Sequence, residues 1–215
     1  MIYVIMCGGE YIQWNPPKWL QVVNGEPIAG RTIRLLKEQG VNGIFISATD
    51  KRLKSLGVPV LEHDNPYTNT DTLHSYWCDA FYPSDRPTCY LFGDVVYSPE
   101  AIKTIIDFQT DDIMFFGSSE PAPEGSYKRW GEPYAFKVVD TAYFKACIHF
   151  TKALQDKGRF KRPPLAWELW QVIQNTPLNE IMPNYCTIND YTCDVDDMDD
   201  LNHMDNVLKE IEGIR

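Results

Sequence analysis

Short apolar runs alternate with helix-compatible stretches along most of the chain, and this alternation limits the possible folds most strongly. The first run, 2–6, favours a buried strand and ends in two glycines. An amphipathic stretch from Pro27 stops at Gly40, and a second apolar run follows at 43–47. Further strands are predicted at 88–92, 113–116 and 134–139, and further helices at 71–81, 99–108, 141–155 and 165–173. The pattern predicts an α/β fold: a three-layer, Rossmann-like, mainly parallel sheet with helices on both faces.

The chain is expected to form one domain, 1–215. Its 215 residues are 44% hydrophobic and show no break in composition. The N-terminal apolar run is too short for a membrane span or a signal-peptide core, and no basic residue precedes it. We therefore expect a cytoplasmic protein with no membrane partner.

The formal net charge of −10 disfavours broad electrostatic attraction to nucleic acid or to an anionic membrane. The six cysteines include no CxxC pair, so neither a zinc site nor a disulfide framework is indicated. An anionic substrate would consequently need a local cationic group or a divalent metal ion.

In an open α/β sheet, ligands bind beyond the carboxyl ends of the strands. After the first strand come Cys7, Gly8 and Gly9, with Lys18 a short loop further on. Paired glycines let backbone N–H groups approach a phosphate, and a lysine supplies positive charge. An ordinary turn with a surface lysine explains the same residues equally well.

A carboxylate follows the strand at 88–92. Gly93 and Asp94 come directly after it, and an aspartate there is suited to hold a divalent cation against phosphate oxygens. The alternative is a helix-capping aspartate. Ser98 followed by proline is a better helix start, which favours the metal role for Asp94.

Two further groups follow predicted strands. Asp194 and Asp196 end a strand at 192–195 before an acidic helix at 198–211, and residues two apart on a strand face the same side. A long loop at 118–131 leads to residues suited to bind an acceptor, which are Glu132, Tyr134 and Lys137. A structural loop-to-strand junction explains this second group equally well.

Five segments occur in a definite order: MCGG at 6–9 with PKWL at 17–20, VNGEPIAGRTI at 23–33, GVNGIFI at 40–46, GD at 93–94, and DVDDMDDL at 194–201. Together they resemble the GT-A-like nucleotidyltransferase superfamily. That superfamily includes the methylerythritol-phosphate and ribitol-phosphate cytidylyltransferases and the sugar-phosphate nucleotidylyltransferases. The resemblance covers almost the whole chain.

The resemblance implies transfer of a nucleoside monophosphate from an NTP to a phosphorylated acceptor, with release of pyrophosphate. It makes Lys18, Asp94 and Lys137 catalytic, and it places Mg²⁺ or Mn²⁺ on Asp94 and on Asp196 or Asp194. The implied nucleotide-binding residues are Cys7, Gly8, Gly9, Lys18, Asn69, Thr70, Ser75 and Gly93. The implied acceptor-binding residues are Glu132, Tyr134 and Lys137.

The small cytidylyltransferases are the nearest resemblance in size, which favours CTP. The acceptor would be a polyol, sugar, or amino-acid or amide phosphate, as used in capsule or cell-surface polysaccharide biosynthesis, and a homodimer is compatible with this class.

One loop departs from the family pattern. The family has an arginine before the lysine, whereas 10–15 contains no basic residue. Either Lys128, Arg129 or Arg31 replaces that charge, or the chain is a non-catalytic nucleotide-binding regulator. A third alternative is a GT-A-type glycosyltransferase, because Asp194 and Asp196 have Asp-x-Asp spacing.

Overall fold

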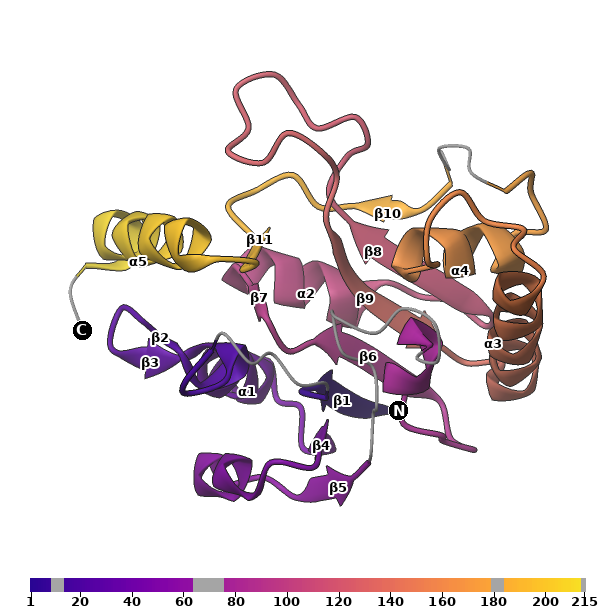
Figure 1. Cartoon of the computed structure of the whole chain (residues 1–215). Helices are drawn as coiled ribbons and strands as arrows, with labels where there is room; N and C mark the ends of the chain where they lie inside the picture. The colour runs from indigo at the N-terminus through magenta and orange to yellow at the C-terminus, as the bar shows by residue number, and fades with distance from the viewer. Residues whose placement is uncertain (9–13, 64–75, 179–183, 214–215) are drawn as a thin grey trace.

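The computed structural model describes residues 1–8, 14–63, 76–178 and 184–213 and centres on one seven-stranded sheet (Figure 1). The strand order is β10-β8-β9-β6-β1-β4-β5. The bounds are β1 (Ile2–Met6), β4 (Ile44–Ala48), β5 (Val60–Glu62), β6 (Thr88–Phe92), β8 (Ile113–Gly117), β9 (Pro133–Val138) and β10 (Cys186–Thr187). Strand β9 runs antiparallel to both of its neighbours, and the other adjacent pairs are parallel. The predicted mainly parallel α/β sheet is confirmed.

Helices cover both faces of this sheet (Figure 1). Their bounds are α1 (Ile28–Glu38), α2 (Pro99–Asp107), α3 (Thr141–Asp156), α4 (Ala166–Ile173) and α5 (Met198–Glu212). Helices α3 and α4 pack together on one side, and α1 and α2 lie on the other (Figure 1). The start of α2 is fixed as its sequence predicts: the Ser98 side chain accepts a hydrogen bond from the amide of Ala101, and proline occupies the first turn.

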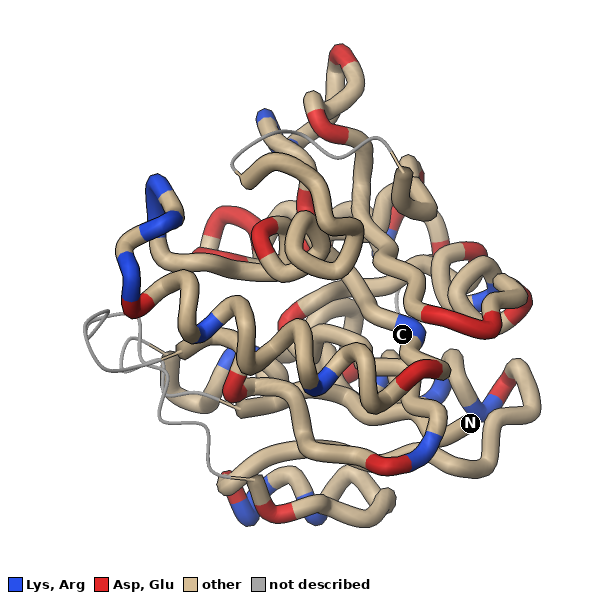
Figure 2. Tube along the Cα trace, turned by 90° about the vertical axis from the view of Figure 1, so that its right-hand side faces the viewer, with Lys and Arg blue, Asp and Glu red and all other residues tan. Residues whose placement is uncertain are grey.

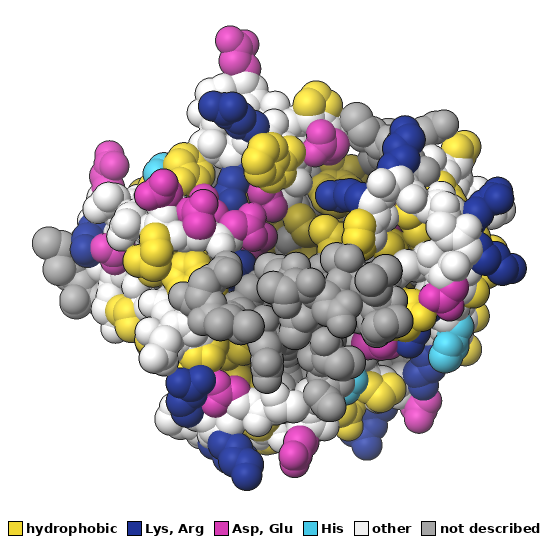
Figure 3. Space-filling view, in the orientation of Figure 1, with side chains coloured by type: hydrophobic (Ala, Val, Ile, Leu, Met, Phe, Trp, Pro, Cys, Tyr) yellow, Lys and Arg dark blue, Asp and Glu magenta, His cyan; other side chains and the backbone are white. Residues whose placement is uncertain are grey.

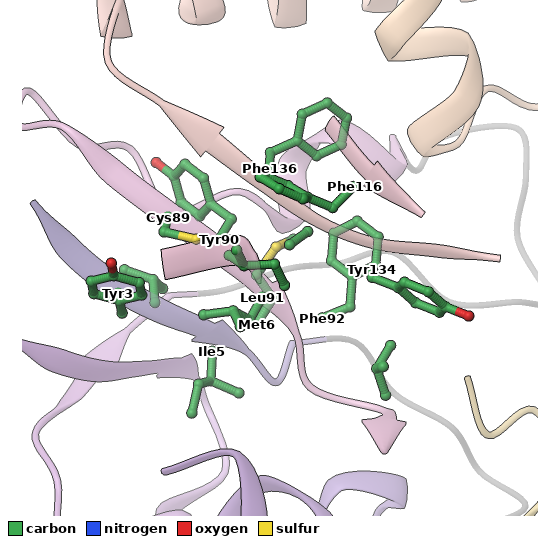
Figure 4. Packing of buried hydrophobic residues seen from close by; sticks show 14 of the residues in the cluster. Tyr3, Ile5, Met6, Cys89, Tyr90, Leu91, Phe92, Phe116, Tyr134 and Phe136 are labelled. Carbon is green, nitrogen blue, oxygen red and sulfur yellow. The ribbon is translucent and has the colours of Figure 1, made fainter. Parts of the chain in front are cut away.

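Aromatic and aliphatic side chains from β1, β6, β8 and β9 pack together in the core (Figure 4). Phe136, from the middle of β9, has its ring centroid 4.8 Å from that of Phe115 and 5.9 Å from that of Phe144. Strands β1 and β6 lie beside each other near the middle of the sheet, and every residue of β6 is buried. This packing fixes the carboxyl ends of both strands.

Two small ribbons stand apart from the main sheet. The strand predicted at 192–195 is β11 (Cys193–Asp194), and it pairs antiparallel with β7 (Val95–Val96) instead of joining the main sheet. The other ribbon joins β2 (Val22–Val23) to β3 (Glu26–Pro27). The first ribbon matters for function, because its register puts Asp194 opposite Val95, one residue after Asp94.

The helix predicted at 71–81 lies partly outside the described residues. Its described part contains a 3-10 helix, Trp77–Ala80, after which Phe81 is already extended. The segment at 118–131 contains neither helix nor strand, as predicted, and extends away from the sheet (Figure 1).

Acidic and basic positions are interspersed along the described part of the chain (Figure 2). None of the helices described is both long and apolar enough to cross a membrane.

Candidate active site

The ends of β1 and β6 form the base of the candidate site. Met6 lies opposite Phe92, and the Gly93 amide donates a 3.0 Å hydrogen bond to the Met6 carbonyl. A Cβ atom at Gly93 would lie 2.4 Å from that carbonyl oxygen and 2.7 Å from the sulfur of Cys7. Only glycine allows this approach, and it sets the position of Asp94.

Lys18 lies in a 3-10 helix (Lys18–Leu20) and is almost completely buried. Its Nζ is 3.7 Å from Oδ2 of Asp94 and 3.4 Å from Oδ1 of Asp196. Burial opposes the charge, but the surrounding carboxylates outweigh burial and raise the pKa of Lys18. The ammonium group therefore bridges carboxylates separated by about half of the sequence. This agrees with the expectation that the site lies beyond the carboxyl ends of the strands.

Three carboxylates form a tight group beside this lysine. Glu132, Asp194 and Asp196 each offer an oxygen, and these oxygens lie within 4.8 Å of one another. Burial raises the pKa of Asp194 well above its ordinary value, and the negative charges of Asp94 and Asp196 raise it further. Burial likewise raises the pKa of Glu132 to about 7, and Asp94 has its pKa raised by burial against the opposing charge of Lys18.

Two oxygens in this group are buried without a hydrogen-bond partner, Oδ1 of Asp194 and Oε1 of Glu132. Unsatisfied buried acceptors are uncommon, and such an atom calls for an explanation such as an ion. Hard divalent cations take oxygen ligands. The donor set and the unpaired oxygens therefore fit Mg²⁺ or Mn²⁺.

Lys128 reaches this group from the loop at 118–131. Its Nζ lies 2.8 Å from Oδ2 of Asp200, 3.4 Å from Oδ2 of Asp196 and 3.7 Å from Oε1 of Glu132. The preceding residue, Tyr127, stacks on His203 of α5 with ring centroids 3.7 Å apart. The sequence suggests Lys128 as a replacement cation, but it does not predict the contact between Lys128 and Asp200.

A cavity of about 280 Å³ joins these groups. Its lining includes Gly8, Lys18 and Asp94, together with residues from several other elements, among them Trp77, Trp130, Arg162 and Trp167. Figure 3 shows a hollow with hydrophobic side chains at its floor, acidic side chains on one side and basic side chains on the other.

Arg162 and Trp167 were missed as site residues. Of the two tryptophans in α4, Trp170 is buried in the core, whereas Trp167 is half-buried and lines the cavity. The basic link at 159–164 was a usable signal for Arg162, whose guanidinium also pairs with Glu168 at 2.7 Å.

A second cavity, of about 420 Å³, is lined mainly by residues from 78–84 and from α3, and this lining is mostly apolar. It contains none of the carboxylates around Lys18, so the smaller cavity is the candidate active site.

Lys137 does not line this cavity, which corrects the expectation that it is catalytic and binds the acceptor. Strand β9 runs antiparallel to β6, and Lys137 pairs with Cys89 near the amino end of β6. Its Nζ donates hydrogen bonds to three carbonyls at the end of α2, those of Ile105, Ile106 and Phe108, at 3.0, 2.8 and 2.6 Å. Lys137 is a helix-capping residue.

Other expected residues have structural partners or lie outside the described part. The Tyr134 hydroxyl is buried and donates to the Thr192 carbonyl at 2.7 Å, so it supports the ribbon that carries Asp194. Arg31 pairs with Glu212 at 2.6 Å and donates to the Tyr97 carbonyl, so it does not replace the loop arginine. Arg129 is exposed and does not line the cavity. Gly9, Asn69, Thr70 and Ser75 lie outside the described residues.

The chain matches the model of a known protein family. Residues 3–159 match the model of the MobA-like NTP transferase domain. No curated protein sequence matches the chain.

Solved structures resemble the chain over nearly its whole length. The inositol-1-phosphate CTP transferase of T. maritima is 13% identical, with a TM-score of 0.58 over 97% of this chain and 96% of that one. A Bacillus anthracis protein provisionally assigned as a glucose-1-phosphate thymidylyltransferase is 13% identical, with a TM-score of 0.61 over 98% and 96%. The 2-C-methyl-D-erythritol 4-phosphate cytidylyltransferase of Thermus thermophilus is 14% identical, with a TM-score of 0.57 over 97% and 98%. At these identities the likeness establishes the fold.

Proposed function

Because the chain belongs to the MobA-like NTP transferase family, we propose that it transfers a nucleoside monophosphate from an NTP, with CTP favoured, to a small phosphorylated acceptor. The observation that carries this proposal is the convergence of Lys18, Asp94 and Asp196 at the cavity beyond β1 and β6. Pyrophosphate is the expected second product.

The part of the cavity around Lys18 suits a triphosphate. Gly8 and Lys18 both line it, and a backbone amide beside an ammonium group is suited to bind phosphate oxygens. Lys18 is held in place by carboxylates before any ligand arrives. Such a preset positive charge is suited to stabilise the charge that develops on the transferring phosphoryl group.

We propose that Asp94 and Asp196, with Asp194 beside them, hold Mg²⁺ or Mn²⁺. When bound, the ion neutralises phosphate charge and orients the triphosphate for in-line attack. By holding the ion, Asp94 and Asp196 would orient the α-phosphorus towards the acceptor. An acceptor phosphate is already ionised at neutral pH, so no protein residue has to remove a proton from it.

The rest of the cavity suits a phosphorylated polyol, sugar or amino-acid derivative. Arg162 supplies positive charge, and Trp130 and Trp167 supply flat apolar surface. The structural likeness to two CTP transferases supports CTP as the donor substrate. Because another similar structure is that of a protein provisionally assigned as a thymidylyltransferase, other NTPs also have to be tested.

The test is a pyrophosphate-release screen of four NTPs against pooled phosphorylated acceptors, with and without Mg²⁺. With the best pair, Asp94→Asn should lower turnover by about 100-fold or more, because charge stabilisation of several kcal/mol is lost. Asp111→Asn is the matched control, since Asp111 is exposed on the turn before β8. Unchanged turnover in Asp94→Asn would remove this aspartate from the mechanism.

Two alternatives have observable signatures. The adjacent positions of Asp194 and Asp196 also suit glycosyl transfer, which releases a nucleoside diphosphate instead of pyrophosphate. The lack of a basic residue at 10–15 favours a regulator, which would bind an NTP in calorimetry but release no pyrophosphate with any acceptor.

A further inference from the structure

The cations of the site are unevenly distributed among its carboxylates. Lys18 lies between Asp94 and Asp196, at 3.7 and 3.4 Å. On the other side of Asp196, the buried oxygens of Asp194 and Glu132 have no hydrogen-bond partner. Lys128 lies 3.7 Å from Oε1 of Glu132, but neither ammonium group donates a hydrogen bond to these two buried oxygens.

We propose that the Glu132 carboxylate is a third protein ligand of a divalent cation, together with Asp194 and Asp196, and that this set binds Mg²⁺ or Mn²⁺ before any nucleotide arrives. The binding of the ion is independent of the proposed function, and only the role of the bound ion in nucleotidyl transfer rests on that function.

The backbone holds Glu132 firmly in the required place. Its amide donates to Oγ of Ser118 at 2.7 Å, and its carbonyl accepts from the Ser118 amide at 2.9 Å. A Cβ atom at Gly117 would lie 2.7 Å from the same carbonyl, so the two strands approach closely at this point. The residue is only 4% exposed, and its carboxylate lies with those of Asp194 and Asp196.

Lys128 does not satisfy Glu132. The 3.7 Å between its Nζ and Oε1 of Glu132 is too long for a hydrogen bond, and Lys128 donates instead to Asp200 and Asp196. Two ammonium groups, of Lys18 and Lys128, thus face five carboxylates, which are those of Asp94, Glu132, Asp194, Asp196 and Asp200. Asp196 is half exposed, but the other four carboxylates are buried or partly buried, and such an excess of negative charge is unfavourable unless protons or a cation compensate it.

The number of carboxylates distinguishes this site from one completed by substrate. Mg²⁺ in nucleotide enzymes is usually bound by one or two carboxylates together with substrate phosphates. Three carboxylates within 4.8 Å supply enough charge and enough oxygen ligands to retain an ion without phosphate. Nucleotide-free binding is therefore the property that tests the inference.

The experiment titrates the nucleotide-free full chain with Mn²⁺ and follows free Mn²⁺ by electron paramagnetic resonance. Wild type should bind one ion, and Glu132→Gln, which has nearly the same shape, should bind it at least tenfold more weakly. Glu124→Gln is the matched control, because Glu124 is exposed in the loop that precedes Glu132. It should bind Mn²⁺ as wild type does.

Equal Mn²⁺ affinity in Glu132→Gln and wild type would overturn the inference, as would a wild type that binds Mn²⁺ only when nucleotide is present. If Glu132→Gln fails to fold by circular dichroism, Glu132→Asp decides instead: its shorter carboxylate should reduce the Mn²⁺-induced rise in Tm, and a rise equal to that of wild type would overturn the inference. Pyrophosphate release is measured separately. Mn²⁺ binding that depends on Glu132 without pyrophosphate release would sink the proposed function alone.

Discussion

Lys18 and Lys137 are both buried, at 2% and 5% exposure, yet they lie at opposite ends of the sheet in opposite surroundings. Lys18 lies beyond the carboxyl ends of β1 and β6 among aspartates. Lys137 lies near the amino end of β6 among the last carbonyls of α2. The first ammonium group lies between full negative charges, whereas the second donates to carbonyl dipoles, with Asp107 exerting a smaller electrostatic effect than burial.

The pKa values express the same difference. Burial lowers the pKa of Lys137, whereas for Lys18 the carboxylates outweigh burial and the pKa is raised. A buried lysine is therefore evidence of a binding site only when its partners carry charge that a ligand or a metal ion would also compensate.

Replacing Lys18 should give the largest effect. In Lys18→Met, pyrophosphate release should fall between about 100- and 1,000-fold, the range seen when one preorganised donor to a transition state is removed. Lys137→Met is the control, and its folded fraction should turn over at the wild-type rate. A Lys137→Met enzyme as impaired as Lys18→Met would break the contrast between the two lysines.

Replacing Lys137 should instead affect stability. In Lys137→Met the carbonyls of Ile105, Ile106 and Phe108 lose a charged donor, so the free energy of unfolding should fall by about 2 kcal/mol. Urea unfolding at neutral pH measures this change. Lys145→Met is the comparison, since Lys145 is partly exposed and pairs with the highly exposed Asp85, and it should change stability by less than about 1 kcal/mol.

The close approach at Gly93 connects stability with the site. Gly93→Ala should lower the free energy of unfolding by about 1–2 kcal/mol, because the new methyl group meets the Met6 carbonyl and Cys7. Asp94 would be displaced, so we also expect turnover to fall.

Gly43→Ala is the matched control, since its nearest contact would be an ordinary 3.6 Å. Equal stability of the two alanine variants in thermal unfolding would show that the turn after β6 adjusts without strain.

The contrast also marks what sequence could and could not predict. Apolar runs and capping residues are local, so the sequence predicted β1, β6 and the start of α2, and the position after β6 identified Asp94. The direction of β9 is not a local property. An antiparallel β9 leaves Glu132 at the carboxyl ends of its neighbours and takes Lys137 away from them.

The pairing of β11 with β7 is equally non-local, and it brings Asp194 beside Asp94 across 100 residues. Arg162 and Trp167 joined the site only because the link before α4 folds back over the cavity. Residue type and spacing do not predict that the segment before α4 lies beside the cavity.

The smallest predicted effect is the pH dependence contributed by Lys137. Its pKa is lowered in the folded state, so at pH values between the folded and unfolded pKa the unfolded chain binds more protons. The folded state consequently gains relative stability as the pH rises through that window, which lies below the ordinary lysine pKa of about 10.4. Urea unfolding of wild type and Lys137→Met at pH 8 and pH 10 isolates the contribution of Lys137, because the other groups titrate in both proteins. From pH 8 to pH 10, the free energy of unfolding of wild type should rise relative to that of Lys137→Met by less than about 1 kcal/mol. A relative fall would mean that the α2 carbonyls favour the charged lysine more than burial disfavours it.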